Sequence, residues 1–348
     1  MTPPEPAPAP DPDLRPDTRP RPAPDGRPGG GGLVVAAVAV TVVLWASAFI
    51  GVRAAGADYQ PGTLALGRQL AGSLGLTAIV AVRWLRRGAR PVLPRGRVLV
   101  AVLAWGVGWF SLYNLALNAA EQHLDAGTTA LLVNVAPVLV AVLAGVLLGE
   151  GFPRRLLVGM ASAFAGVALI AAATSSGERD VVGVVLGLAA AVLYAGAATS
   201  QKRLLARVDA LTMTWVGCLA GTVVLLPFGP ALVAEATAAP AASTWAVVLL
   251  GLGPTAVAFT TWGYALSRLS AGRAAATTYL VPPIVVLLSW LVLAEVPAPV
   301  VLAGGALCLA GVAVATAPRR RMAVATPSGG QSPTVSVASQ SSSVVGKV

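Results

Sequence analysis

Ten long runs of apolar residues, separated by short polar segments, dominate the pattern of this chain. Each run has about 19–24 residues, and about 20 apolar residues in a helix cross the roughly 30 Å hydrocarbon core of a bilayer. No run alternates as a barrel strand does, and a backbone facing lipid must satisfy its own hydrogen bonds. The pattern therefore predicts an all-α polytopic membrane protein with ten transmembrane helices. They are expected near residues 33–53, 62–82, 98–119, 126–149, 155–174, 181–201, 210–228, 244–266, 273–294 and 298–317.

The same pattern occurs twice along the chain. At an offset of 149 residues, Trp45-Ala46-Ser47-Ala48 falls on Tyr194-Ala195-Gly196-Ala197; beyond the loop at 121–123 the offset becomes 145, and Pro137 falls on Pro282. Each copy holds five helices, and because five is odd the second copy starts on the opposite side of the membrane. Inverted repeats of this kind are typical of carriers that open alternately to the two sides. The prediction is two five-helix repeats at 33–174 and 181–317, with disordered tails at 1–32, rich in Pro and Gly, and at 318–348.

Composition and charge strengthen the membrane assignment. Of the 348 residues 56% are hydrophobic and 11% charged, whereas a soluble domain has about 25% charged residues. All but three of the 24 lysines and arginines lie in segments that are cytoplasmic if the N-terminus is; the exceptions are Arg53, Arg68 and Arg179. This bias follows the positive-inside rule. We therefore expect a multi-pass protein of a bacterial-type inner membrane with both termini in the cytoplasm, in contact with lipid and not with nucleic acid.

Signatures of catalysis are lacking in the sequence. It contains no P-loop, zinc-protease motif or nucleophile elbow, and its two cysteines are solitary and mid-helix, which indicates packing. We expect no catalytic residue, metal or cofactor. A membrane-embedded enzyme or a non-transporting scaffold remain the alternatives to a carrier, and the oligomeric state stays open, with a monomer possible. Carboxylates fall at helix ends, in loops or in tails, and His123 is expected to be solvated, so no proton carrier is apparent.

Prolines mark the middle of two predicted helices at equivalent repeat positions. Pro137 and Pro282 each remove a backbone donor and clash with the preceding turn, which should kink or break the helix. Carbonyl groups freed at this depth are tolerated where they face protein or a watery cavity. Asn134 and Tyr279 are repeat equivalents, each three residues before its proline. We therefore expect a central cavity at the two helix breaks.

Arg68 is the charged residue placed most deeply in a predicted span, about seven residues into the second helix. An arginine there is costly, by about 2.5 kcal/mol or more at a helix centre, unless it finds a partner or snorkels. Its repeat equivalent is Gly217, so the repeat does not require it. Two interpretations follow: the guanidinium binds the carboxylate of an anionic or zwitterionic substrate, or it snorkels to the interface or bonds helix-end carbonyls.

Two further pairs of repeat equivalents lie at helix ends. Arg53 and Lys202 are expected to anchor helices at the interface, while Glu150 and Glu295 each end a helix, where a carboxylate opposes the macrodipole and needs a partner. A gate or latch built on such a pair is a further hypothesis. Polar and aromatic residues within the spans are the candidates to line a substrate cavity: Trp45, Ser47, Phe49, Arg68, Tyr113, Asn114, Asn134, Tyr194, Trp262, Tyr264, Thr278 and Tyr279.

Several short motifs give the chain a family resemblance. They are Leu44-Trp45-Ala46-Ser47-Ala48-Phe49, Pro61 followed by Arg68, Ala126-Gly127 leading to Pro137, Gly149-Glu150, and Gly159 to Gly166. In order and spacing the chain resembles the EamA-type branch of the drug/metabolite transporter (DMT) superfamily over residues 33–317. The resemblance implies a ten-helix inner-membrane carrier without a cofactor, usually an exporter of amino acids or related small metabolites. It also implies a central cavity built from helices 1, 3, 4, 6, 8 and 9.

Overall fold

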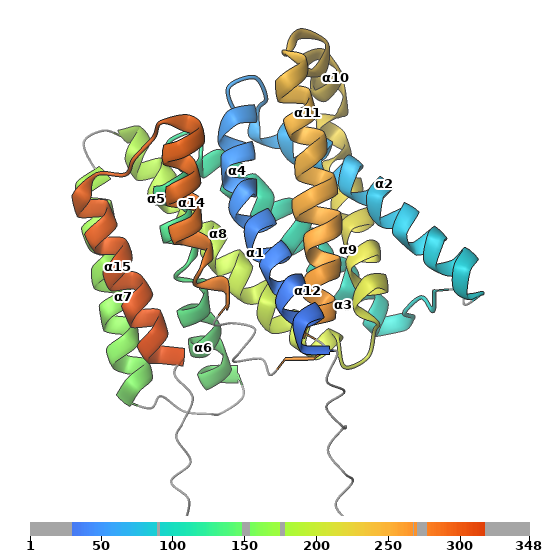
Figure 1. Cartoon of the computed structure of the whole chain (residues 1–348), viewed down its shortest axis with the longest axis horizontal. Coiled ribbons are helices and arrows are strands. Elements are labelled where there is room, and N and C mark those ends of the chain that lie inside the picture. Colours follow the sequence, from blue (N-terminus) through green and yellow to red (C-terminus); the bar gives the residue numbers. More distant parts are fainter. Residues whose placement is uncertain are drawn as a thin grey trace, which may run out of the picture. The chain divides into compact units, whose positions relative to one another are not determined.

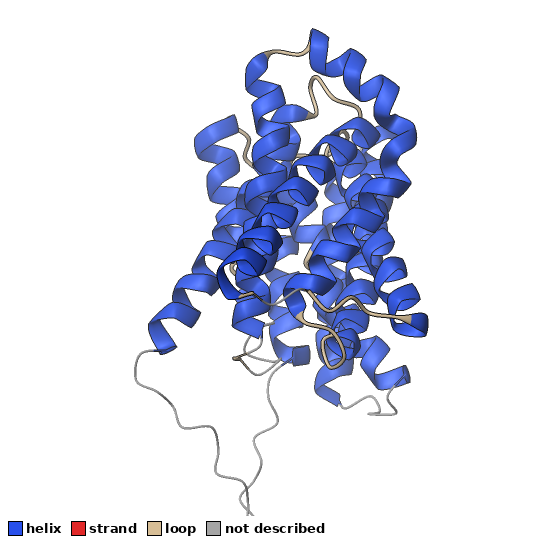
Figure 2. Cartoon of the chain, turned by 90° about the vertical axis from the view of Figure 1, so that its right-hand side faces the viewer, coloured by secondary structure: helices blue, strands red, loops and turns tan. Residues whose placement is uncertain are grey.

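A computed structural model describes residues 30–88, 91–147, 154–174, 178–266, 268–269 and 277–316, and over these ranges the chain is helical with no strand (Figures 1 and 2). The first half consists of α1 (Gly30–Ala55), α2 (Pro61–Arg87), α3 (Gly96–Gly106), the π-helical η2 (Val107–Tyr113), α4 (Asn114–Ala120), α5 (Ala126–Val133), α6 (Ala136–Leu147) and α7 (Arg154–Thr174). The second half consists of α8 (Glu178–Leu204), α9 (Ala210–Leu225), the 3-10 turn η3 (Leu226–Phe228), α10 (Gly229–Ala238), α11 (Ala241–Leu250), the π-helical η4 (Gly251–Val257), α12 (Ala258–Leu266), α14 (Val281–Leu288), the π-helical η5 (Ser289–Leu293) and α15 (Pro299–Thr316).

Six helical stretches are long and apolar enough to cross a membrane, judged by length and composition. They are Gly32–Ala55, Pro61–Arg86, Gly96–Ala120, Val181–Gln201, Ala210–Ala238 and Ala241–Leu266. Four shorter apolar helices lie at Ala126–Val140, Leu157–Ile170, Val281–Leu293 and Pro299–Val314. The apolar runs found in the sequence are thus helical, while the count of ten membrane-crossing helices stays a prediction. The predicted tails lie outside the described residues.

Helices that are equivalent in the repeat pattern pack against each other in opposite directions. On α2 and α9, Ser73 Oγ and Thr222 Oγ1 are 2.8 Å apart and differ by 149 positions; on α7 and α15, Cys308 Sγ donates to the Ala163 carbonyl at 3.1 Å across 145 positions. A residue that contacts its own repeat equivalent must lie close to a two-fold axis. Along α7 and α15, which lie side by side in Figure 1, Gly166 meets Gly304 and Gly159 meets Gly311, so the two helices are antiparallel. This is the arrangement that an inverted repeat requires.

Two helices break at equivalent positions, next to the matched prolines. α5 ends at Val133 and α6 begins at Ala136; in the second half, two turn residues, Tyr279 and Leu280, precede α14. Pro137 has no N–H for the Val133 carbonyl, and the Val138 N–H donates to Val135 instead of to Asn134. Backbone carbonyls of Val133 and Asn134 are thereby released from the helix.

One helical segment lies where the sequence predicted a loop. The seventh predicted helix ends at 228, but α10 extends the same stretch to Ala238 before the chain turns back into α11. Pro227 and Pro230 each occupy the first turn of a new helical segment, where a missing N–H costs nothing. The Ala-rich sequence that follows has high helix propensity. Glu235 of α10 accepts hydrogen bonds from the Gln60 N–H at 3.1 Å and from the Thr63 hydroxyl, at the start of α2.

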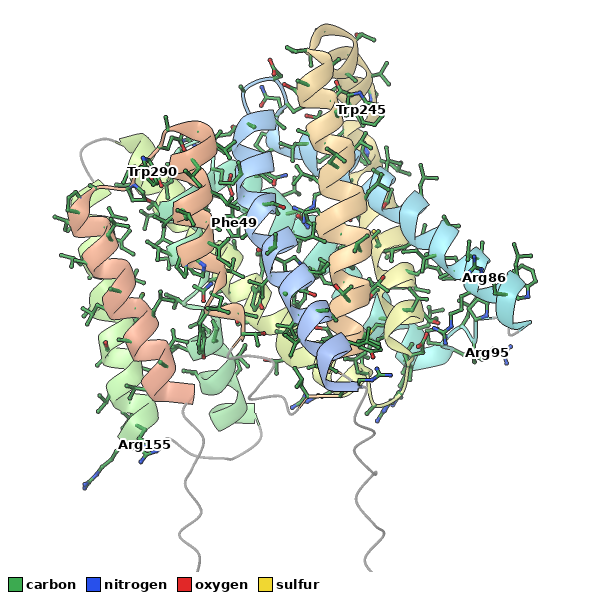
Figure 3. All side chains as sticks on the ribbon, in the orientation of Figure 1. Phe49, Arg86, Arg95, Arg155, Trp245 and Trp290 are labelled. Carbon is green, nitrogen blue, oxygen red and sulfur yellow. The ribbon has the colours of Figure 1, made fainter. Side chains whose placement is uncertain are left out.

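Apolar side chains cover much of the outer surface of the bundle. Leu74, Leu85 and Val100 are 72%, 81% and 65% exposed, whereas polar side chains such as Gln69, Ser111 and Thr128 are fully buried. This distribution is the reverse of a soluble protein and suits contact with lipid. Arg95 and Arg155 lie toward one end of the bundle, and Trp245 and Trp290 toward the other (Figure 3).

Candidate substrate cavity

A cavity of about 70 Å³ lies between the helices at the level of the α5–α6 break. Its volume admits a few water molecules, so a metabolite would need the helices around it to move apart. The walls come from α1, α2, η2, α4, the α5–α6 break, α8, α12, Thr278 and α14. The lining residues are Trp45, Ala48, Phe49, Arg68, Trp109, Phe110, Tyr113, Asn114, Leu117, Val133, Asn134, Ala136, Pro137, Tyr194, Phe259, Thr278 and Val281.

Aromatic rings from four helical elements meet at this cavity. Trp45 of α1 lies 5.6 Å from Phe259 of α12, centroid to centroid, in an edge-to-face arrangement. Trp109 of η2 lies 5.1 Å from Tyr194 of α8 and 5.6 Å from Phe259. Aromatic pairs at 4.5–7 Å are worth about 0.5–1.5 kcal/mol beyond their buried area. The cluster therefore gives the cavity a rigid apolar wall, suited to an aliphatic or aromatic part of a ligand.

Arg68 supplies the positive charge of the cavity. Its side chain is 5% exposed, its Nε donates to Thr255 Oγ1 at 3.0 Å, and its Nη1 has no hydrogen-bond partner. The structure places the guanidinium at the cavity wall, which is the position that the carboxylate-binding interpretation requires. A buried guanidinium with an open N–H is an unsatisfied donor in a low-dielectric site. The open donor is free to take an acceptor from a ligand.

The hydrogen-bonded pair Arg68–Thr255 has no counterpart of the same kind in the two-fold relation between the two halves of the chain. By the offset of 149, the counterpart of Arg68–Thr255 is Gly217–Gly106. There the two backbones touch: a Cβ on Gly106 would lie 2.3 Å from the Gly217 carbonyl oxygen. The backbones of Gly106 and Gly217 therefore fill the space whose counterpart in the other half holds the Arg68 side chain. The positive charge of Arg68 is thus present on α2 and absent from the matched helix α9, where glycine occupies the equivalent position.

Two asparagines, Asn114 and Asn134, line the same cavity as Arg68. Asn114 Nδ2 donates to the carbonyls of Trp109 at 3.0 Å and Phe110 at 3.2 Å, which belong to the π-helical η2. The Oδ1 atoms of Asn114 and Asn134 are buried without a hydrogen-bond partner. Together with the carbonyls released at the α5–α6 break, these oxygens form an acceptor-rich region that would suit an ammonium group.

Of the residues expected at the cavity, Trp45, Phe49, Arg68, Tyr113, Asn114, Asn134, Tyr194, Thr278 and the helix-break residue Pro137 line it. The others lie elsewhere. Ser47 bonds back to the Leu44 carbonyl at 2.9 Å, one turn along its own helix, and Trp262 packs behind Trp45 at 5.2 Å. Tyr264 lies under the guanidinium of Arg268, 3.7 Å from ring centroid to Cζ.

Tyr279 and Pro282 also lie outside the cavity wall. Tyr279 packs against the apolar cluster that contains Leu131 and Ile170, while Pro282 sits in the buried first turn of α14. Trp109, Phe110 and Phe259 are cavity residues that the sequence analysis did not select. Trp109, Tyr113 and Leu117 follow one another at spacings of four, the signal of a single helix face, which could have identified Trp109.

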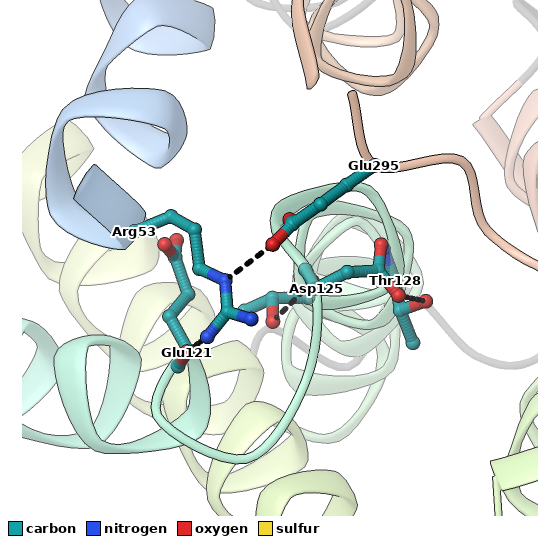
Figure 4. Close-up of polar contacts among 6 residues, drawn as sticks. Arg53, Glu121, Asp125, Thr128 and Glu295 are labelled. Atoms are coloured by element: carbon teal, nitrogen blue, oxygen red, sulfur yellow. Dashed lines mark hydrogen bonds and ion pairs between the residues drawn. The ribbon is translucent and has the colours of Figure 1, made fainter. Parts of the chain in front are cut away.

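A second polar group of residues lies at the end of α1, and we call Arg53, Glu121 and Glu295 the Arg53 cluster. Arg53 Nε donates to Glu295 Oε1 at 2.9 Å, and Arg53 Nη1 donates to the Glu121 backbone carbonyl at 2.9 Å (Figure 4). These bonds join the end of α1 to the segment after η5 and to the α4–α5 loop; the expected role of Arg53 as an interfacial anchor stays a prediction. Glu150 lies outside the described residues. No group of three or more His, Cys, Asp or Glu suited to a metal occurs among the residues that were placed.

Comparison with known proteins supports a carrier. The model of the EamA-like transporter family matches residues 32–172 and again residues 181–317. A protein of Streptantibioticus cattleyicolor named "Probable terminal-alkyne amino-acid exporter" is 40% identical over 276 residues, covering 79% of this chain and 91% of its own length. The "Uncharacterized transporter YdfC" of Bacillus subtilis is 31% identical over 269 residues, covering 77% and 86%. A crystal structure 22% identical in sequence matches 84% of this chain and 99% of its own with a TM-score of 0.58, a likeness of fold.

Proposed function

The chain belongs to the EamA-like transporter family, and we propose that it exports a small amphipathic metabolite with a free carboxylate, of the amino-acid class, by alternating access. The observation that carries the proposal is Arg68, a buried guanidinium at the wall of an aromatic cavity with an open N–H donor. The relative at 40% identity is named as an amino-acid exporter, which fits the same substrate class.

The cavity offers a separate environment for each part of an amino acid. Arg68 Nη1 would bind the carboxylate, a charge-assisted interaction that a neutral donor could not match. Unpaired oxygens of Asn114 and Asn134 would accept from the ammonium group. The ring wall of Trp45, Trp109 and Phe259 would contact the side chain.

Alternating access would use the breaks next to Pro137 and Pro282. We propose that the repeats 33–174 and 181–317 rock about the antiparallel contacts of α2 with α9 and of α7 with α15. The breaks at Asn134–Val135 and Tyr279–Leu280 provide hinge points at matching places in the two halves. An inverted pair of repeats exchanges its conformations when the carrier opens to the other side.

We also propose that both termini face the cytoplasm in a bacterial-type inner membrane. Arg95 and Arg155 lie at the end of the bundle that the positive-inside rule assigns to the cytoplasm, and the exposed Trp245 and Trp290 lie toward the other end (Figure 3). The Arg53 cluster would then lie on the extracellular side of the cavity.

The test is selectivity for the carboxylate in proteoliposomes. Wild-type protein should transport a neutral amino acid such as leucine and discriminate against leucinamide, which lacks the carboxylate. Arg68→Gln should lower leucine transport about ten- to hundredfold, since a hydrogen bond to a charged group is worth about 1.5–3 kcal/mol, and should leave leucinamide unchanged.

Arg83→Gln is the matched control. Arg83 lies on the same helix and carries the same charge, but it is exposed and bonds Asp209 at 3.5 Å. It should transport leucine as the wild type does. If Arg68→Gln transports carboxylate substrates normally, Arg68 is not the carboxylate ligand.

A further inference from the structure

Glu121 is a carboxylate that the folded chain buries without a partner. It follows α4 directly and is 2% exposed, and neither carboxylate oxygen has a hydrogen-bond partner. No dashed line reaches its carboxyl group in Figure 4, although Arg53 and Glu295 lie beside it. The same residue lines a pocket with Arg53, Gln122 and Glu295 at the predicted extracellular side. The sequence places Glu121 in a loop and gives no sign of its burial, which only the structure shows.

The neighbouring charges do not compensate an ionised Glu121. Arg53, the nearest cation, is engaged by the Glu295 carboxylate and by the Glu121 backbone. Asp125 accepts from the Thr128 N–H at 2.8 Å and adds a second negative charge. The charged or titratable groups that face Glu121 are Arg53 of α1, Arg68 of α2, Tyr113 of η2, Asp125 at the start of α5 and Glu295 after η5, with His123 in the same loop.

Burial therefore favours the protonated form. Removal from water raises the pKa of the Glu121 carboxyl well above its ordinary range; Arg53 and Arg68 lower the pKa by less than burial raises it, and Asp125 and Glu295 add smaller upward contributions. If the helices parted at this end, water would reach the carboxyl and its pKa would return toward the ordinary value of about 4.3. The closed form then binds a proton that the open form releases.

We propose that Glu121 is a proton-binding site, and that its protonation accompanies closure of the transport pathway on the side of the Arg53 cluster. The proton comes from the solution on that side as the pathway closes and returns to it when the pathway opens. This inference rests on the alternating access proposed above, but not on the identity of the substrate.

The charge on Glu121 would control how firmly the Arg53 cluster holds the pathway closed. With Glu121 neutral, Arg53 pairs with Glu295 and holds the end of α1 against η5. With Glu121 ionised, two carboxylates compete for one guanidinium, and the buried charge is stabilised by water entering from outside. The ratio of closed to open protein should then fall by up to about tenfold for each unit of rising pH between the two pKa values of Glu121.

Cysteine accessibility measures this ratio without substrate. Leu117 lies one turn before Glu121, whose N–H donates to the Leu117 carbonyl at 3.1 Å. Its side chain is 2% exposed and lines the central cavity. Leu117→Cys should therefore react with a membrane-impermeant maleimide only when the outer pathway is open. Labelling of intact cells between pH 5.5 and 8.5 is normalised to Ala238→Cys, an exposed position on α10, which corrects for the reactivity of the thiol. Cys218 and Cys308 are buried, and the parent protein gives their background.

The expected normalised rate for Leu117→Cys rises at least tenfold from pH 5.5 to 8.5. Adding Glu121→Gln, a neutral isostere of the protonated form, should make the rate low and independent of pH, whereas Glu121→Asp should retain the pH dependence. Asp58→Asn, which removes an exposed carboxylate at the same end, should behave as the parent does. A parent rate that does not change with pH, or a pH dependence that survives Glu121→Gln, would overturn the proposal.

Because no substrate is present, this outcome is separate from the proposed function. A protein that transports no amino acid could still show the Glu121-dependent labelling. Conversely, normal carboxylate transport with pH-independent labelling would leave the function in place and remove only the proton site.

Discussion

Replacing Gly106 by alanine should destabilise the protein by a predictable amount. The added Cβ would lie 2.3 Å from the carbonyl oxygen of Gly217 and 2.4 Å from its Cα. Both atoms belong to backbone, so no side chain can rotate away, and α3 and α9 must separate by roughly 1 Å to reach an ordinary contact distance. Overpacking of this kind costs about 1–3 kcal/mol.

Alanine also favours helix over glycine, by about 0.5–1 kcal/mol. The expected net effect of Gly106→Ala is therefore a destabilisation of about 1–2 kcal/mol. Gly108 provides the matched control, because it lies two residues along and a Cβ there would meet nothing within 4 Å. Gly108→Ala should keep only the helix-propensity gain and should be at least as stable as the wild type.

The assay is thermal unfolding in detergent with a thiol-reactive fluorogenic dye. Cys218 and Cys308 are 0% and 1% exposed, so both report when the helices around them open. Gly106→Ala should melt a few degrees below Gly108→Ala. Equal melting temperatures would refute the argument that the counterpart of the Arg68–Thr255 pair is a forced backbone contact.

Two further predictions concern transport and one concerns cysteine accessibility. Thr255→Val removes the acceptor of Arg68 Nε, so it should raise the KM for a carboxylate substrate severalfold in proteoliposomes while the amount of folded protein is unchanged; an unaltered KM would show that Thr255 does not orient Arg68. Pro137→Ala restores the N–H that the Val133 carbonyl lacks and should slow substrate exchange by favouring a continuous helix, a result that faster exchange would contradict. Glu295→Gln removes the charged partner of Arg53 and should raise the labelling of Leu117→Cys at every pH; lower labelling would mean that the ion pair does not hold the pathway closed.

The sequence predicted most of the architecture because the membrane imposes strong rules. Long apolar runs must be helices, and repeated prolines at equivalent depth must interrupt them. The breaks at Asn134–Val135 and Tyr279–Leu280 lie at matching positions, next to Pro137 and Pro282. The antiparallel packing of equivalent helices agrees with the predicted odd number of helices in each repeat.

The site was less accessible to sequence reasoning, because the direction of a side chain depends on which helices meet. Ser47 and Trp262 lie in helices that reach the cavity but do not line it: Ser47 bonds to its own helix and Trp262 packs against Trp45. The sequence places Glu121 in a loop, and only the packing of the α4–α5 connection against α1 shows that it is buried. Local sequence carries no signal for such a long-range contact. The predicted helix at 210–228 also ended too early, because Pro227 and Pro230 begin new helical turns that carry the helix on to Ala238.

Counterflow in proteoliposomes tests the central claim most directly. Vesicles loaded with an unlabelled amino acid and diluted into a trace of the labelled one should accumulate label transiently, in a saturable manner, and Arg68→Gln should reduce this accumulation at least tenfold while Arg83→Gln should not. Label that never exceeds the level in protein-free vesicles, for any amino acid in a broad panel, would contradict an amino-acid carrier.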